Sequence, residues 1–179
     1  MNFSSEYRDN QGQIVALYRD VFTASEGADE GAAAGKLVTD LLGTTPPREL
    51  KVFTGYDGQQ LIAAAVFTRL TYANDPRSVF ILSPMAVATH HQAKGLGKAL
   101  INHALDDLRR ADVDVVITYG DPAFYGKVGF KSLDQTQVAP PLPLSMPHGW
   151  IGQSLTHSPL KSISGACSCV PALNNPAIW

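Results

Sequence analysis

The chain has 179 residues, of which 45% are hydrophobic and 17% are charged, and its formal net charge is −2. This length suits one domain with a proper core, so we expect a single domain over residues 1–179. The slightly negative charge gives no general attraction to nucleic acid or to an anionic membrane, and neither partner is expected. No apolar run approaches the roughly 20 residues of a membrane span. The N-terminus lacks the basic-then-apolar order of a secretory signal, so we expect a cytoplasmic protein.

The first half of the chain predicts two helices and three antiparallel strands. Apolar residues at helical spacing predict the first helix at 9–22. The stretch 25–35 is rich in glycine, alanine and acid, and predicts a mobile loop that leads into a second helix, which ends at 44–47. The strands are predicted at 51–55, 60–70 and 78–88. The first two are joined across Asp57-Gly58, a strong hairpin signal.

The second half alternates helices and strands. The elements are predicted in this order: a helix at 96–111, a strand at 113–119, a short helix at 122–128, and strands at 130–133 and 150–155. Residues 161–179 are predicted to be irregular or to form a short edge strand. An exposed final strand could pair with a second copy of the chain, which would give a homodimer. The order of elements predicts an α/β fold with a mixed sheet flanked by helices.

Two cysteines, Cys167 and Cys169, lie one residue apart near the end of the chain. A disulfide between such close positions is geometrically awkward, and a cytoplasmic chain would keep both thiols reduced. A zinc site would need two more ligands at suitable spacing, and His148 and His157 do not supply them. We therefore expect structural thiols and no bound metal.

A short glycine loop, Gln92-Ala93-Lys94-Gly95-Leu96-Gly97, lies between the third predicted strand and the helix at 96–111. Such a loop gathers backbone N–H groups at the positive end of the helix dipole, where an anion can bind. Arg109 and Arg110 close the last turn of the helix, which suits the negative end of the same dipole. The loop is therefore predicted to bind phosphate.

Three phosphate-binding patterns can be compared with this loop. Gln92 occupies the place of the first glycine of a Walker loop, and Ala99 the place of its serine or threonine, so that pattern fails. Leu100 occupies the place of the last glycine of a dinucleotide fingerprint. That fingerprint also needs an acid at the end of the next strand, whereas Asp112 and Asp114 begin it. The third pattern, Gln/Arg-x-x-Gly-x-Gly/Ala, is matched in full.

This third pattern resembles the acyl-CoA loop of the GCN5-related N-acetyltransferase (GNAT) superfamily. A second motif follows the strand at 113–119, where Asp121-Pro122 predicts a helix start. The run Tyr125-x-x-x-Gly-Phe then resembles the segment that carries the catalytic tyrosine of the same superfamily. Packing of Tyr125 in an aromatic core is the alternative. The tail 143–155 resembles a bacterial branch of predicted acetyltransferases.

The resemblance implies a single-domain fold with a mixed sheet of about six to seven strands. Its two central strands, here 79–87 and 113–119, would splay apart at one end to admit coenzyme A. Pro84 agrees with this, because proline cannot donate to a strand ladder and belongs at a bulge or an opening. The cofactor-binding residues that the resemblance implies are Met85, Ala86, Val87, Gln92, Ala93, Lys94, Gly95, Leu96, Gly97 and Lys98.

The implied function is transfer of the acetyl group of acetyl-CoA to a primary amine by direct attack. Tyr125 would be the general acid, and Glu26 or Glu30 would be the base, directly or through water; solvated acids in a flexible loop are the alternative for both glutamates. The acceptor, a small-molecule amine or a protein amine, would bind among residues 25–36, 72–77 and 140–150. A module that binds acyl-CoA without chemistry, as a sensor, remains an alternative function, and a nucleotide-binding domain is a weaker one.

Overall fold

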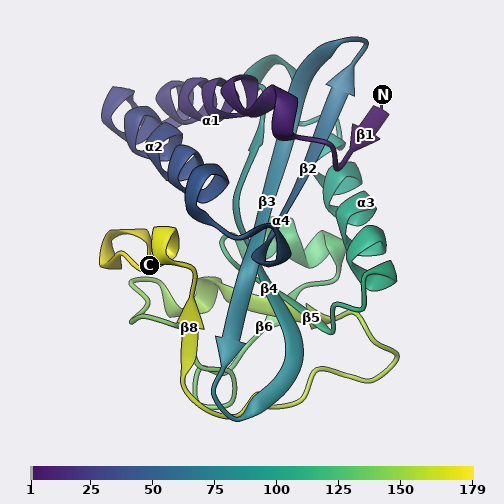
Figure 1. Cartoon of the computed structure of the whole chain (residues 1–179), viewed down its shortest axis with the longest axis vertical. Coiled ribbons are helices and arrows are strands. Elements are labelled where there is room, and N and C mark those ends of the chain that lie inside the picture. The colour runs from purple at the N-terminus through teal and green to yellow at the C-terminus, as the bar shows by residue number, and fades with distance from the viewer. Residues whose placement is uncertain (1) are drawn as a thin grey trace. The chain divides into compact units, whose positions relative to one another are not determined.

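The computed structural model describes residues 2–179, which form two compact units. The first unit holds the chain up to Phe67 together with Pro84–Ala104, and the second holds Thr68–Ser83 together with Leu105–Trp179. Strands β3 (Gln60–Tyr72) and β4 (Asp75–Val87) and helix α3 (Leu96–Arg110) each run from one unit into the other. Figure 1 shows these elements along the chain.

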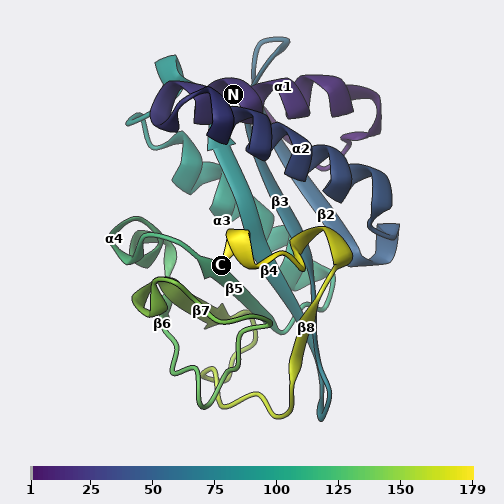
Figure 2. The same cartoon turned by 90° about the vertical axis from the view of Figure 1, so that its left-hand side faces the viewer.

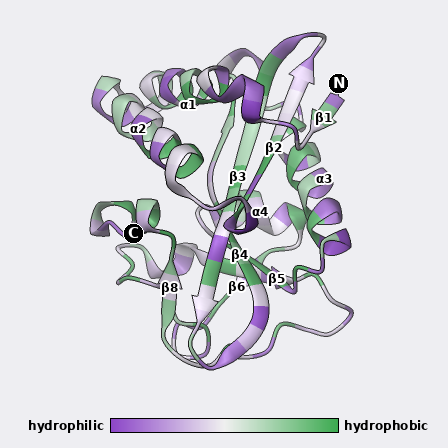
Figure 3. Ribbon diagram, viewed as in Figure 1, coloured by the Kyte–Doolittle hydropathy of each residue, from purple (hydrophilic) through white to green (hydrophobic). Residues whose placement is uncertain are grey.

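The first unit is built on two antiparallel helices, α1 (Gln11–Glu26) and α2 (Ala28–Thr44), which lie side by side in Figures 1 and 2. Their buried side chains include Ile14, Tyr18, Val38 and Leu41, all with no exposed surface. Hydrophobic and hydrophilic residues alternate along both helices in Figure 3, as expected for helices with one buried face. The strands β1 (Asn2–Ser4) and β2 (Leu50–Asp57) pair antiparallel in the same unit.

The prediction of a mobile loop at residues 25–35 is wrong, because only Gly27 separates α1 from α2. Alanine is the best helix former, and Asp29 and Glu30 lie in the first turn of α2, where acidic side chains favour a helix start. Gly31 packs against α1 so closely that a Cβ there would lie 2.6 Å from the carbonyl oxygen of Arg19. Gly31 therefore allows α2 to pack closely on α1.

The second unit contains the remaining elements. These are β5 (Val115–Tyr119), α4 (Pro122–Tyr125), β6 (Lys131–Ser132), β7 (Trp150–Ser154) and β8 (Cys167–Cys169). Short 3-10 helices occur in both units, at Arg8–Asn10, Pro47–Glu49, Thr89–His91, Gly126–Val128, Pro147–Gly149, Pro171–Leu173 and Pro176–Ile178. Strand β8 pairs antiparallel with the end of β3, and Cys167 and Cys169 are free thiols there.

Within residues 2–179 the strands form one eight-stranded sheet in the order β1-β2-β3-β4-β5-β7-β6, and β8 pairs with β3. The fold is a mixed α/β fold with an open, mostly antiparallel sheet flanked by helices, as predicted, with β1 in addition to the expected strands. Strand β8 lies within residues 161–179, which were predicted to be irregular or to form a short edge strand. Strand β7 lies between β5 and β6 rather than at an edge. Every helix in this part of the chain is too short or too polar to span a bilayer.

Candidate functional site

The end of β4 offers a backbone donor that points away from its neighbour in the sheet. The amide of Ala88 donates to the carbonyl oxygen of Ile62 in β3 at 2.8 Å. Because backbone groups of successive strand residues point to opposite edges, the amide and carbonyl of Val87 point away from β3. The Val87 carbonyl accepts a hydrogen bond from the side-chain amide of Gln92 at 2.9 Å. Gln92 therefore ties the loop that follows to this free edge.

The loop after the 3-10 helix at 89–91 has an alternating backbone. Ala93 and Gly95, on either side of Lys94, have φ values of +59° and +79°. Left-handed residues that alternate with others turn successive N–H groups toward one side and form a concave nest for anions. Such a φ costs an alanine about 1 kcal/mol or more, and strain of this kind persists where the surroundings enforce it. Gly95 has open space around the position of a Cβ.

Helix α3 begins directly after this loop. The amide of Ala99 donates to the carbonyl of Gly95 at 3.0 Å, so the amides of residues 96–98 precede this helical hydrogen bond. These amides and the positive end of the helix dipole face the same space beyond the helix start. Lys98 is exposed, and the Lys94 ammonium donates to the carbonyl of His90 at 2.9 Å. The first unit thus presents a row of main-chain donors that suits a diphosphate.

The second unit carries Tyr125 on a short, well-defined turn of helix. Asp121 caps α4 by accepting the amide of Ala123 at 2.8 Å, and Pro122 occupies the first helical position, as predicted. Gly129, with a φ of +94°, ends the following 3-10 helix. The sequence signals around this turn therefore place the tyrosine correctly in local structure.

The Tyr125 ring lies in an aromatic and partly polar environment. Its centroid is 5.0 Å from that of Phe124 and 5.6 Å from that of Phe130. Desolvation by burial raises the pKa of Tyr125, and contact with the Thr118 hydroxyl opposes this shift. The phenol is therefore protonated throughout the neutral range and can donate a proton. The residue keeps partial exposure.

The parallel pairing of β4 with β5 is short. It joins Val79–Leu82 to Val115–Thr118. At the last pair of this ladder, the Thr118 hydroxyl donates to the Leu82 carbonyl at 2.9 Å. Strand β4 continues to Val87 beyond this last pair. Pro84 lies in that continuation, which agrees with the opening predicted from its missing N–H. Its carbonyl accepts from the Tyr18 hydroxyl at 2.9 Å.

Several of the predicted residues take positions that the sequence did not indicate. Glu26 ends α1 and Glu30 lies in the first turn of α2, and both are exposed on helices rather than on a loop. Met85 is half-buried, and Ala86 and Val87 are buried. Tyr18 is one of the apolar residues at helical spacing in the predicted helix 9–22, and its hydroxyl also donates to the Ala64 carbonyl at 2.8 Å. Its polar partners lie far away in sequence, so no local signal reveals them.

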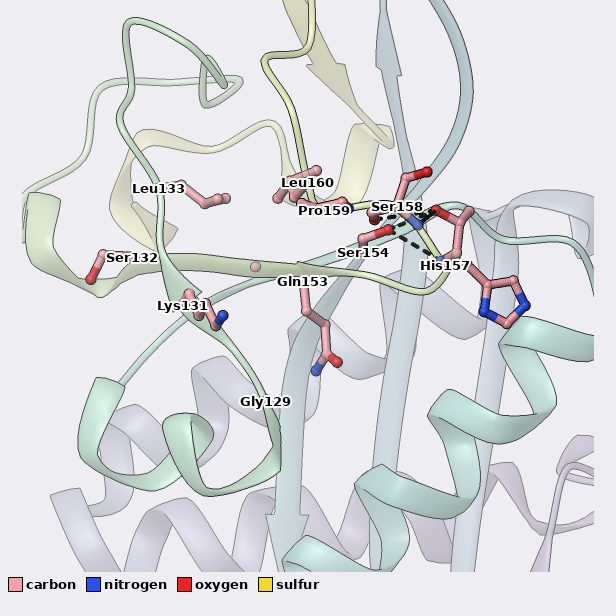
Figure 4. Close-up of a pocket in the computed structure, with 12 residues that line it drawn as sticks. Gly129, Lys131, Ser132, Leu133, Gln153, Ser154, His157, Ser158, Pro159 and Leu160 are labelled. Atoms are coloured by element: carbon pink, nitrogen blue, oxygen red, sulfur yellow. Dashed lines mark hydrogen bonds between the residues drawn. The ribbon is translucent and has the colours of Figure 1, made fainter.

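Two cavities, one in each unit, are lined by none of the predicted site residues. One, of about 490 Å³, is bordered by β6, β7 and the loop 156–160, where Figure 4 shows Lys131, Gln153 and Ser154. The other, of about 480 Å³, lies beside α1 and is lined in part by Asp20, Ala88 and Thr89. Over residues 2–179, no group of three or more His, Cys, Asp or Glu side chains is arranged to hold a metal ion.

Comparison with known proteins identifies a family. Residues 48–132 match the model of the acetyltransferase (GNAT) domain. The chain is 31% identical over 157 residues to the uncharacterized N-acetyltransferase YjhQ of Escherichia coli, and the match covers 84% of each chain. It is 30% identical over 107 residues to the uncharacterized N-acetyltransferase YhbS of the same organism, which covers 57% of this chain and 60% of YhbS.

Solved structures share the fold. The GNAT family N-acetyltransferase YhbS from Escherichia coli, in complex with CoA, superposes with a TM-score of 0.82 at 23% identity, over 97% of this chain and 92% of that one. A GNAT family acetyltransferase from Brucella melitensis, in complex with acetyl-CoA, gives a TM-score of 0.74 at 17% identity, over 96% of both chains. An aminoglycoside 6'-N-acetyltransferase complexed with coenzyme A gives a TM-score of 0.64 at 14% identity, over 89% of this chain and 99% of that one.

Proposed function

The chain belongs to the GNAT family of acetyltransferases, and from this premise we propose that it transfers the acetyl group of acetyl-CoA to a primary amine, with Tyr125 as general acid. The observation that carries the proposal is the alternating backbone at Ala93 and Gly95, directly ahead of α3. Its main-chain N–H groups would donate hydrogen bonds to the anionic diphosphate of coenzyme A. The relatives that bind CoA or acetyl-CoA share this fold.

The cofactor-binding residues would act mainly through their backbone. The amides from Ala93 to Lys98 would hold the diphosphate, and Lys94 and Lys98 would add positive charge. Met85, Ala86 and Val87 would pair with the pantetheine amides as a neighbouring strand would. The Val87 amide, which points to the free edge of β4, would polarise the thioester carbonyl. One such donor can be worth roughly 3 kcal/mol in the transition state.

Tyr125 would protonate the leaving thiolate. The thioester supplies the acetyl group: the amine nitrogen forms the new C–N bond as the C–S bond breaks. Tyr125 gives its phenol proton to the sulfur and is reprotonated from solvent, while the amine loses a proton to a base. Because burial raises the pKa of Tyr125, the phenol is in the correct form at neutral pH. Glu26 or Glu30, both exposed, would accept the amine proton directly or through water.

The first test combines binding and turnover. Calorimetry with acetyl-CoA and thiol release with a panel of small amines and peptides should show binding and acceptor-dependent turnover. Tyr125→Phe should keep the acetyl-CoA dissociation constant and lower kcat by about 10²- to 10⁴-fold. Tyr56→Phe is the matched control, because it also removes a phenol hydroxyl, one that accepts a hydrogen bond from the Asn10 side-chain amide at 3.0 Å.

The same experiment separates the enzyme from a sensor module. Binding of acetyl-CoA without turnover on any amine would favour the non-catalytic alternative. Unchanged turnover in Tyr125→Phe would remove Tyr125 as the acid and leave acetyl transfer itself standing. The single domain, the cytoplasmic location and the homodimer stay predictions, which cell fractionation and light scattering can test.

A further inference from the structure

A long stretch of the second unit carries no formally charged side chain. Residues 135–160 contain no Asp, Glu, Lys or Arg; the stretch includes the residues 140–150 that the sequence predicts beside the acceptor. The acids closest to it in the chain are Asp121 and Asp134, and both are engaged locally. Asp121 accepts the amide of Ala123 at 2.8 Å, and Asp134 accepts the amide of Thr136 at the same distance.

Two glycines bring this stretch close to Tyr125. A Cβ on Gly120 would lie 2.7 Å from Cε2 of the Tyr125 ring, so the ring packs directly on this backbone. The amide of Gly120 donates to the carbonyl of Gly149 at 3.0 Å. A Cβ on Gly149 would lie 3.1 Å from the Tyr119 ring and 3.2 Å from the Gly120 carbonyl. The backbone at Gly120 therefore contacts both the Tyr125 ring and Gly149.

Met146 is held out from this backbone toward solvent. The residue is 56% exposed, and among the described residues it is the one large hydrophobic residue that is exposed. Its amide donates to the Tyr119 hydroxyl at 2.7 Å, and its carbonyl accepts from the amide of Gly149 at 2.9 Å. Tyr119 is itself fixed, since its ring stacks on Trp179 with 6.2 Å between centroids and its hydroxyl bonds to that of Ser145 at 3.0 Å. The exposure of Met146 thus belongs to an ordered segment.

We infer that the acceptor is an amine whose non-reacting part is apolar and uncharged, and that Met146 contacts that part. The inference rests on the proposed acetyl transfer and adds the class of substrate. A second ammonium on the part of the acceptor that faces residues 135–160 would meet no acidic side chain of that stretch and would lose its water there without a partner. An apolar group would instead cover Met146 and gain from burial. Met146 is thereby a specificity-determining residue.

The test compares two acceptors of equal length, n-hexylamine and 1,6-diaminohexane, with the full chain and acetyl-CoA. We expect kcat/KM to be at least about tenfold higher for the monoamine, per amino group. Met146→Gln keeps the length of the side chain and makes its end polar, so it should raise KM for hexylamine several-fold. Met146→Leu should keep the wild-type value. His157→Gln, in the same stretch 135–160, is the control that should leave both kcat/KM and KM for hexylamine unchanged.

The outcomes separate the inference from the proposed function. If the diamine is acetylated as well as or better than the monoamine, or if Met146→Gln leaves KM unchanged, the inference is overturned and acetyl transfer stands. If acetyl-CoA binds and no amine of either kind is acetylated, the proposed function fails, and the inference falls with it.

Discussion

Residues 92–98 and residues 135–160 are both largely irregular, but different groups hold them in place. The first segment takes its shape from its own backbone, with positive φ at Ala93 and Gly95 and a helix start directly after them. The second is held by side chains distant in sequence, such as Tyr119, whose hydroxyl accepts the amide of Met146 at 2.7 Å and whose ring stacks on Trp179. We therefore expect changes in the first segment to alter cofactor affinity, and changes around the second to alter stability and acceptor binding.

The largest expected effect on stability is that of Trp179→Ala. Trp179 is 5% exposed, its ring centroid lies 6.1 Å from that of Trp150, and its Nε1–H donates to the Leu173 carbonyl at 2.8 Å. Its removal should lower the free energy of unfolding by roughly 3–5 kcal/mol, as measured by urea denaturation. Trp179→Phe, which keeps an aromatic ring, should lose less. A loss below 1 kcal/mol would show that Trp179 does not hold this segment.

The largest expected effect on cofactor affinity is that of Gly95→Val, in the segment 92–98. A β-branched residue is strained at a φ of +79°, so the loop amides should turn out of line. We expect acetyl-CoA affinity to fall about 10- to 100-fold, equivalent to roughly 1–3 kcal/mol, with little change in the unfolding of the second unit. Ala93→Gly, which relieves strain at φ +59°, is the matched control and should bind at least as tightly as wild type. Equal affinity in Gly95→Val would contradict the backbone account.

The pH dependence of stability should follow Asp75, which accepts hydrogen bonds from Arg77 and from the amide of Ser164 at 3.5 Å. Hydrogen bonds from Arg77 lower the pKa of Asp75 to about 2 from its usual 3.8. A carboxyl whose pKa is depressed in the folded state stabilises the fold above its unfolded pKa. That stabilisation should therefore be complete above pH 4 and be lost as the pH falls toward 2. Asp75→Asn should lower the free energy of unfolding by roughly 1 kcal/mol at neutral pH. In thermal unfolding, the variant should lose less stability than wild type between pH 4 and pH 2.

The smallest effect concerns the link between β4 and the loop. Gln92→Ala removes the hydrogen bond to the Val87 carbonyl and should weaken acetyl-CoA binding by about 0.5–1 kcal/mol. Gln92→Arg keeps a donor of sufficient reach and should recover part of that loss. A tighter complex in Gln92→Ala would show that this side chain does not organise the loop.

The parts of the site that were predictable from sequence are those built by local chemistry. Gly95 before a helix, Asp121-Pro122 at a helix start and Gly129 at a helix end each act within a few residues. The prediction of a loop at 25–35 is wrong because its alanines and all of its glycines except Gly27 lie in helix α2. Asp29 and Glu30, two and three residues after Gly27, are a usable signal for the start of α2.

The remaining features depend on contacts between distant segments. Tyr18 meets the carbonyls of Ala64 and Pro84, and Tyr119 meets Ser145 and Trp179. Nothing within a short window of sequence distinguishes either tyrosine from an ordinary core residue. The lack of charge over residues 135–160 was visible in the sequence, but it gained meaning only when Gly120 and Gly149 were found to bring that stretch near Tyr125.

The central claim is that main-chain amides ahead of α3 bind the diphosphate of coenzyme A. The most direct measurement is a titration of the ¹⁵N-labelled protein followed by amide chemical shifts, with coenzyme A and with pantetheine, which lacks the diphosphate. We predict large shifts of the amides of residues 93–98 with coenzyme A and small ones with pantetheine. Equal shifts with the two ligands, or shifts with coenzyme A that leave these amides unmoved, would contradict the claim.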